Sequence, residues 1–270
     1  MTEWAGIDTG VPLVPQLADR VRLAAPEGAE TVLVGSTGLG PDDSAAALNA
    51  LLPGTREVLL AHDSVTCYLG ALGDRTGCVV AAGTGVVTLA AGRTRVKRVD
   101  GWGWIIGDAG SGSWIGKRAF DAVMRAYDGR GPATLLTDVI AADFPDLESA
   151  YLELQADPRR VFRLASYARR VDDVAAQDEV ARRILQDAAA EMVTSAVRGL
   201  EQVDADAGDP VCQLGNVFRS AVVREAFVAG LSEQRPSARL EAPSGTSLDG
   251  ADLLDRVSTG LTTRVDRSVG

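Results

Sequence analysis

The stretch from Gly77 to Gly116 constrains the fold more than any other part of the chain. An apolar run leads into a Gly83-Thr84-Gly85 turn, and a second apolar run leads out of it, which predicts a hairpin of two strands. Glycine lets a backbone bend through positive φ and approach an anion closely, and the Thr84 hydroxyl adds a hydrogen-bond donor. The turn is therefore a candidate phosphate site, with an ordinary hairpin turn as the alternative.

The composition excludes several classes of function. The net charge is −10 and no Lys/Arg cluster forms a stripe, so nucleic acid and an anionic membrane surface are not expected partners. The chain has one histidine and three widely spaced cysteines, which predict neither a zinc site nor a disulfide framework. Without a signal-like start or a membrane-spanning run, the chain is expected to be cytoplasmic.

Strand and helix patterns alternate along the chain, which predicts an α/β fold. Helices are expected at 11–25, 42–52, 65–73, 178–203, 217–231 and 250–257. Strands are expected at 31–34, 57–61, 77–90 (the hairpin), after the charged turn at 93–100, 211–214 and 239–242. The polar tail from Ser258 to Gly270 is expected to fray.

Asp63 is the candidate general base. It follows the strand expected at 57–61, and ligands of open α/β sheets bind beyond the carboxyl ends of strands. The alternative is that Asp63 and Ser64 cap the next helix. His62 has no partner that would make a metal pair, so it is interpreted as incidental.

The loop from Gly101 to Gly112 holds five glycines, which are costly to order unless the backbone must approach something closely. Asp108 in this loop could accept hydrogen bonds from sugar hydroxyls, and Trp102 offers an apolar ring to a sugar. A packed turn with core tryptophans is the alternative. Gly215-Asn216, at a strand-to-helix junction, places backbone donors at a helix N-terminus and is a weaker candidate for nucleotide binding.

Three spaced blocks resemble the BadF/BadG/BcrA/BcrD ATPase family, and within it the N-acetylglucosamine kinases of the sugar kinase, heat-shock protein and actin superfamily. The blocks are Ala61-His62-Asp63-Ser64, Ala82-Gly83-Thr84-Gly85, and Gly101-Trp-Gly-Trp-Ile-Ile-Gly-Asp108-Ala-Gly-Ser. The third block is the specific one. Leu214-Gly-Asn-Val-Phe218 and Gly250-Ala-Asp-Leu-Leu254 are similar to the adenosine turn and the closing helix of the family.

The resemblance implies a two-domain actin-like (ribonuclease H-like) ATPase fold. A remnant of the N-terminal domain would span 1–75, joined by a closing helix at 250–258, and a helix-rich ATPase domain would span 76–249. ATP and Mg²⁺ would phosphorylate an amino sugar, most simply N-acetylglucosamine to its 6-phosphate, and the protein could form a homodimer. The implied roles are base and sugar ligand for Asp63, phosphate binding for Gly83, Thr84 and Gly85, sugar binding for Gly101, Trp102, Gly103 and Asp108, and adenine or ribose binding for Gly215 and Asn216.

The family's opening Asp-Gly-Gly-Gly-Thr phosphate loop has no counterpart here. Gly6-Ile-Asp-Thr-Gly10 lacks a preceding strand, so residues 1–25 are interpreted as a later helix of the first domain. Either the protein starts upstream or the chain is a truncated relative, for which an open sheet edge and poor catalysis are expected.

Two other functions remain open at this point. One is a non-catalytic protein that binds sugar or nucleotide. The other is an ATPase that activates a dehydratase, although Cys67, Cys78 and Cys212 lack the spacing for an iron–sulfur cluster.

Overall fold

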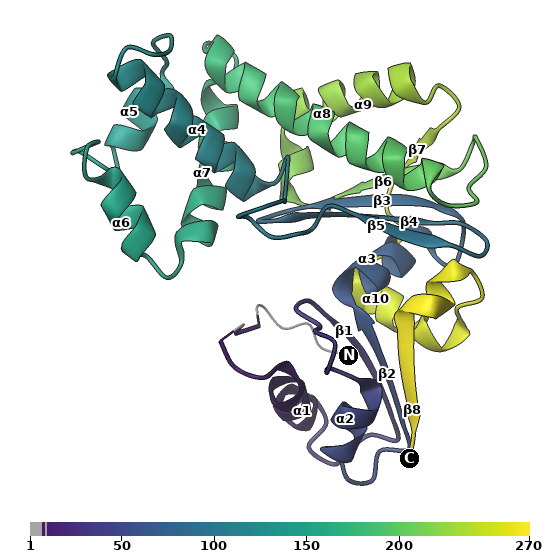
Figure 1. Cartoon of the computed structure of the whole chain (residues 1–270). Coiled ribbons are helices and arrows are strands. Elements are labelled where there is room, and N and C mark those ends of the chain that lie inside the picture. The colour runs from purple at the N-terminus through teal and green to yellow at the C-terminus, as the bar shows by residue number, and fades with distance from the viewer. Residues whose placement is uncertain (1–6, 9) are drawn as a thin grey trace.

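The computed structural model describes residues 7–8 and 10–270, which form two β-sheets joined by a pair of helices (Figure 1). The first sheet has the strand order β1-β2-β8, in which β2 lies parallel to β1 and antiparallel to β8. The elements of this layer are β1 (Thr31–Ser36), β2 (Glu57–His62), β8 (Val265–Val269), α1 (Leu13–Ala24) and α2 (Ala45–Ala50). Apolar side chains of α1 and α2 pack against β1 and β2 and form the core of this layer.

The second sheet has the order β5-β4-β3-β6-β7 and carries the glycine-rich turn. Its strands are β3 (Gly77–Ala82), β4 (Val86–Ala91), β5 (Val96–Val99), β6 (Pro210–Leu214) and β7 (Arg239–Glu241). The helices α8 (Glu179–Glu201) and α9 (Ala221–Gln234) cover one face of the sheet (Figure 1). β6 lies parallel to β3, so the carboxyl ends of these two strands meet at one edge.

Two helices lie between the sheets, α3 (Asp63–Leu72) and α10 (Ser247–Ala251) (Figure 1). They cross so closely that a Cβ at Gly70 would run into the Thr246 carbonyl oxygen, and a Cβ at Gly250 into that of Thr66. Buried side chains of α3 contact strands of both sheets. The crossing therefore fixes the position of α3, whose first residue is Asp63.

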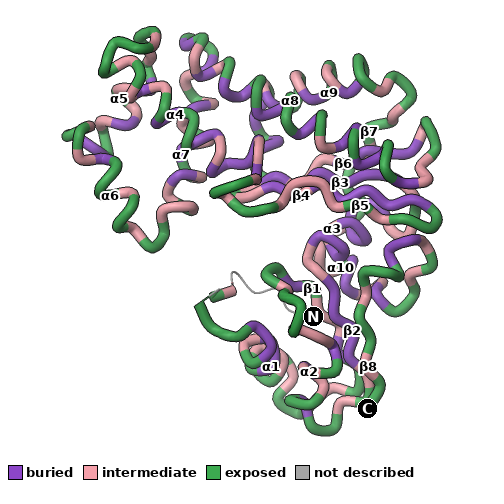
Figure 2. Tube along the Cα trace, in the orientation of Figure 1, coloured by how far each residue is buried: buried purple, intermediate pink, exposed green. Residues whose placement is uncertain are grey.

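A helical extension follows the glycine-rich loop. Its helices are α4 (Gly112–Tyr127), α5 (Leu136–Ala141), α6 (Ala150–Ala156) and α7 (Arg160–Val174). Phe120 makes edge-to-face contacts with Phe144 and Tyr167, with ring centroids 5.4 and 5.0 Å apart. Figure 2 shows that buried positions concentrate in the central strands and α3, while the outer turns are exposed. Among the described residues, no helix has both the length and the apolar character that crossing a membrane requires.

The alternation of strands and helices is confirmed, and the largest correction concerns the C-terminal tail. The tail expected to fray instead forms a 3-10 turn, η3 (Gly260–Arg264), and the strand β8. The prediction was wrong because it rested on the polar sequence of the tail. As an edge strand, β8 is held by backbone pairing with β2 and needs few apolar side chains.

Three helix predictions also need revision. The helix expected at 250–257 is split into α10 and a 3-10 turn, η2 (Leu254–Arg256), and the one expected at 217–231 into η1 (Asn216–Arg219) and α9. Ser220 caps α9, since its side chain accepts a hydrogen bond from the Val223 N–H. The helix expected at 42–52 is the shorter α2.

The expected helix at 11–25 is observed as α1. Gly6 and Thr9 of the Gly6–Gly10 motif lie outside the described residues. Within the part of the chain that the structure describes, β1 has β2 as its one strand neighbour, so one edge of the first sheet is open.

Candidate active site

The Gly83-Thr84-Gly85 turn is fixed against the start of α4. The Gly83 carbonyl accepts a hydrogen bond from the Gly112 N–H at 2.8 Å, and the Thr84 carbonyl accepts one from the Ser113 N–H at 3.0 Å. In a trans peptide the N–H points opposite to the C=O of the same unit. The N–H groups of Thr84 and Gly85 are therefore directed away from α4, as a pair suited to an anion.

Asp100 organises the glycine-rich loop, a role that the sequence analysis missed. Its carboxylate accepts hydrogen bonds from the N–H groups of Asp108 and Ala109, each at 2.8 Å, across eight and nine residues. Asp100 has φ of +57°, a conformation that Asp and Asn adopt more readily than most residues. A Cβ at Gly107 would run into the Asp100 carboxylate. The Asp-Gly pair that opens the loop was the available signal.

Asp108 lies between this loop and the hairpin turn. Its Oδ1 accepts a hydrogen bond from the Gly103 N–H at 3.2 Å, and a Cβ at Gly85 would lie 2.7 Å from its Oδ2. Burial raises the pKa of Asp108, the hydrogen bonds from Gly103 and Val86 N–H lower it, and the nearby Asp100 carboxylate raises it further, so the net shift is upward. The predicted phosphate turn and the predicted sugar loop thus meet at one buried carboxyl group.

Trp102 is an exposed member of the predicted sugar-binding set. Trp102 is 57% exposed, and the Arg98 guanidinium lies 4.3 Å from the centroid of its ring. A guanidinium at this distance makes a cation–π contact and covers part of one ring face. Gly101 and Gly103 flank Trp102 with φ of +76° and +85°, a region that disfavours other residues.

Asp63 opens α3 directly after β2, on the first sheet. It is the acidic residue in the first turn of the helix, where the helix dipole favours a negative charge. The residue before it, His62, is the N-cap, and its side chain accepts a hydrogen bond from the Ser64 N–H. Asp63 is therefore not the cap that the sequence alternative proposed, and its side chain is 43% exposed.

Gly215 and Asn216 lie where β6 ends beside the hairpin. Gly215 has φ of +97°, and a Cβ there would run into the Ala82 carbonyl oxygen at the end of β3. Asn216 is the first residue of the 3-10 turn η1. The carboxyl end of β6 therefore lies against the strand that leads into the Gly83 turn.

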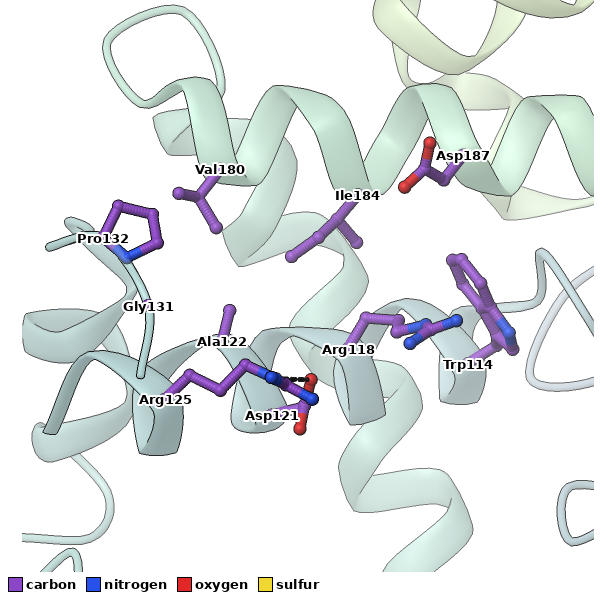
Figure 3. Close-up of a pocket in the computed structure, with 10 residues that line it drawn as sticks. All are labelled: Trp114, Arg118, Asp121, Ala122, Arg125, Gly131, Pro132, Val180, Ile184 and Asp187. Atoms are coloured by element: carbon purple, nitrogen blue, oxygen red, sulfur yellow. Dashed lines mark hydrogen bonds and ion pairs between the residues drawn. The ribbon is translucent and has the colours of Figure 1, made fainter. Parts of the chain in front are cut away.

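A cavity between α4 and α8 lies away from these residues. Its volume is about 270 Å³, and Figure 3 shows that side chains of α4, including Trp114 and Arg118, face Ile184 and Asp187 of α8 across it. None of the predicted site residues lines it. Among residues 7–8 and 10–270, no group of three or more His, Cys, Asp and Glu side chains is arranged to hold a metal ion.

The two sheets, the helix crossing between them and the glycine turn at a strand edge define an actin-like ATPase fold. The family model of the BadF/BadG/BcrA/BcrD ATPases matches residues 15–251. The chain belongs to this family.

Two curated relatives are named as amino-sugar kinases. A Clostridium acetobutylicum protein named N-acetylmuramic acid/N-acetylglucosamine kinase is 33% identical over 146 residues, which are 52% of this chain and 47% of the relative. A Dictyostelium discoideum N-acetyl-D-glucosamine kinase is 28% identical over 195 residues, which are 68% of this chain and 60% of the relative. The chain thus spans about half the length of the curated relatives it matches.

A solved structure supports the same fold. A Chromobacterium violaceum protein assigned as an N-acetylglucosamine kinase superimposes with a TM-score of 0.71 at 26% identity. The match covers 89% of this chain and 86% of that chain.

Proposed function

We propose that the protein transfers the γ-phosphoryl group of ATP to an amino sugar, converting N-acetylglucosamine to its 6-phosphate. The phosphoryl-transfer part is supported by membership of an ATPase family and by the paired N–H groups of Thr84 and Gly85. The amino-sugar part is supported by the names of the relatives. The observation that carries the proposal is Asp63, a carboxylate that opens α3 at the carboxyl end of β2.

In the proposed reaction, the sugar O6 attacks the γ-phosphorus and the bond from that phosphorus to the bridging oxygen of ADP breaks. Asp63 accepts the proton of the sugar hydroxyl. The N–H groups of Thr84 and Gly85 bind phosphate oxygens and stabilise their charge. Catalysis by such a site is mainly positioning, because phosphoryl transfer needs little covalent help from the protein.

Mg²⁺ is expected to bind with the nucleotide. Hard oxygen ligands suit this ion, and phosphate oxygens held at the Gly83–Gly85 turn would supply them. The bound ion would neutralise part of the phosphate charge during transfer. The protein's own contribution is then to hold the phosphates at the turn.

The sugar would lie against the glycine-rich loop. The exposed ring of Trp102 offers an apolar surface to the C–H groups of a sugar. Backbone groups of Gly101 and Gly103 and the carboxyl group of Asp108 supply the polar contacts in this proposal. The Asp108 carboxyl group, whose pKa is raised mainly by burial, can accept hydrogen bonds from sugar hydroxyls.

Adenine or ribose would bind near Gly215 and Asn216. The close approach of Gly215 to the Ala82 carbonyl brings this turn next to the phosphate turn. Asn216 adds an amide side chain that can both donate and accept hydrogen bonds.

The test measures ADP release by the purified protein with Mg-ATP and a panel of sugars, including N-acetylglucosamine, N-acetylmuramic acid and glucose. We expect turnover with an N-acetylated sugar and a fall in kcat of about 100-fold or more for Asp63→Asn. Asp74→Asn serves as the matched control. The Asp74 carboxylate accepts hydrogen bonds from Ser258 and Thr259, and it contacts none of the predicted site residues. Absence of ADP release with every sugar, or full activity of the Asp63 variant, would contradict the proposal. Calorimetric sugar binding without ADP release would instead support a non-catalytic binding protein.

An iron–sulfur activator of a dehydratase receives less support. Burial raises the pKa of the Cys212 thiol to about 11, and burial also raises the pKa of Cys78. Iron–sulfur clusters bind thiolates, which these environments disfavour. A brown chromophore in anaerobically purified protein would reverse this conclusion.

A further inference from the structure

His62 contacts the proposed base directly. Its Nδ1 lies 2.9 Å from Oδ1 of Asp63 and 2.8 Å from Oγ of Ser64. The same atom accepts a hydrogen bond from the Ser64 N–H at 3.2 Å, which caps α3. One ring nitrogen therefore lies within hydrogen-bond distance of both the Ser64 N–H that caps the helix and the Asp63 carboxylate.

These contacts need different forms of Nδ1, because the Ser64 N–H needs its lone pair and the Asp63 carboxylate needs a proton on it. When Nδ1 is unprotonated, its lone pair accepts the Ser64 N–H and has no attraction for a carboxylate oxygen. When Nδ1 carries a proton, it donates to Asp63 and the Ser64 N–H loses its acceptor. Ser64 is 4% exposed, so water has little access to replace that bond. Nδ1 can therefore bond either to the Ser64 N–H or to Asp63, and the bond to Asp63 requires the proton on Nδ1.

The geometry also limits how Asp63 can move. Its side chain is 43% exposed, and Oδ1 is the atom that the ring contacts. Contact at Oδ1 restricts rotation of the carboxylate and leaves Oδ2 as the atom that can face a substrate. A restrained base keeps its reacting oxygen in place more of the time.

We propose that His62 is a positioning residue, which orients the Asp63 carboxylate through Oδ1 so that Oδ2 accepts the proton of the sugar hydroxyl. This inference rests on the proposed role of Asp63 as the base. It assigns His62 no contact with the sugar or the nucleotide.

The contact itself can be tested without any enzymatic activity. His62 is the single histidine of the chain, so labelling histidine with ¹⁵N yields one pair of ring signals. We expect Asp63→Asn to move the Nδ1 signal by several ppm, because the partner of that nitrogen changes. Asp74→Asn, which removes a carboxylate that has no contact with the ring, should leave the signal in place. An unchanged Nδ1 signal in the Asp63 variant would overturn the proposal.

Kinetics then test the consequence for Asp63. We expect His62→Ala to lower kcat about tenfold with little change in the KM for ATP, because misplacing a reacting group costs rate rather than nucleotide binding. His62→Asn should recover most of the rate, since its amide can donate to Asp63 and Asn is a favourable N-cap.

Ser44→Ala is the matched control for loss of a helix cap. Ser44 caps α2 in the same layer, where its Oγ accepts from the Ala47 N–H at 3.1 Å. This variant should keep the wild-type kcat. An equal loss in His62→Ala and Ser44→Ala would reduce His62 to a structural cap, and no recovery in His62→Asn would contradict a hydrogen bond donated to Asp63. A wild-type protein without kinase activity would refute the proposed function, whereas the ¹⁵N measurement would still decide the contact.

Discussion

Replacing Asp100 by Asn should loosen the glycine-rich loop without disturbing the rest of the fold. The Asp100 carboxylate uses one oxygen for the Asp108 N–H and the other for the Ala109 N–H, both at 2.8 Å. An amide has one acceptor oxygen, so one of these N–H groups loses its partner. Asn also tolerates the φ of +57° at this position, so the substitution removes a hydrogen bond and a charge without adding backbone strain.

The magnitude follows from the bonds lost. A hydrogen bond to a charged group contributes about 1.5–3 kcal/mol, and Ala109 is half-buried, so we expect a loss of about 2 kcal/mol in the free energy of loop opening. A loss of about 2 kcal/mol corresponds to roughly 30-fold faster exchange. Native-state hydrogen exchange at the Asp108 and Ala109 amides measures it, because loop opening is a local event.

Two further variants separate hydrogen bonding from strain. Asp100→Gly and Asp100→Ala both remove the acceptor, but only alanine is strained at positive φ, so it should cost about 1 kcal/mol more than glycine. Exchange that is unchanged at both the Asp108 and the Ala109 amide in Asp100→Asn would refute the role assigned to Asp100. Equal exchange in the glycine and alanine variants would refute the contribution of backbone strain.

Two other predictions concern stability, both measured by urea unfolding. Gly215→Ala should lower the free energy of unfolding by about 3 kcal/mol, because the added Cβ would clash with the Ala82 carbonyl oxygen and the residue has positive φ. Gly129→Ala should cost about 1 kcal/mol, because Gly129 has positive φ but open space around it. Equal losses in the two variants would contradict the clash. Burial alone would raise the pKa of Asp74, but hydrogen bonds from the turn at 258–259 outweigh it and lower the pKa. The stability that this carboxylate contributes is therefore present above about pH 4 and lost as the pH falls through its folded pKa. The stability gap between wild type and Asp74→Asn should narrow below about pH 4, and a gap independent of pH would contradict this.

Local patterns predicted the elements that hold the site. Two apolar runs on either side of the Gly83–Gly85 turn predict the hairpin, which is observed as β3 and β4. The sequence also predicts that Asp63 follows a buried strand, because the change from apolar to polar residues marks the end of that strand. These features depend on residues within a few positions of one another.

The amino-acid sequence alone is enough to predict the family, the alternation of strands and helices, and the positions of Asp63 and the glycine-rich loop along the chain. Three features are visible only in the folded structure: Asp100 orders the glycine-rich loop, His62 rather than Asp63 caps α3, and the polar tail forms β8. Each of these three features depends on hydrogen bonds whose partners come together only when the chain folds. A polar residue's partner is not encoded in its own neighbourhood, because several donors and acceptors compete for it until packing brings one of them close.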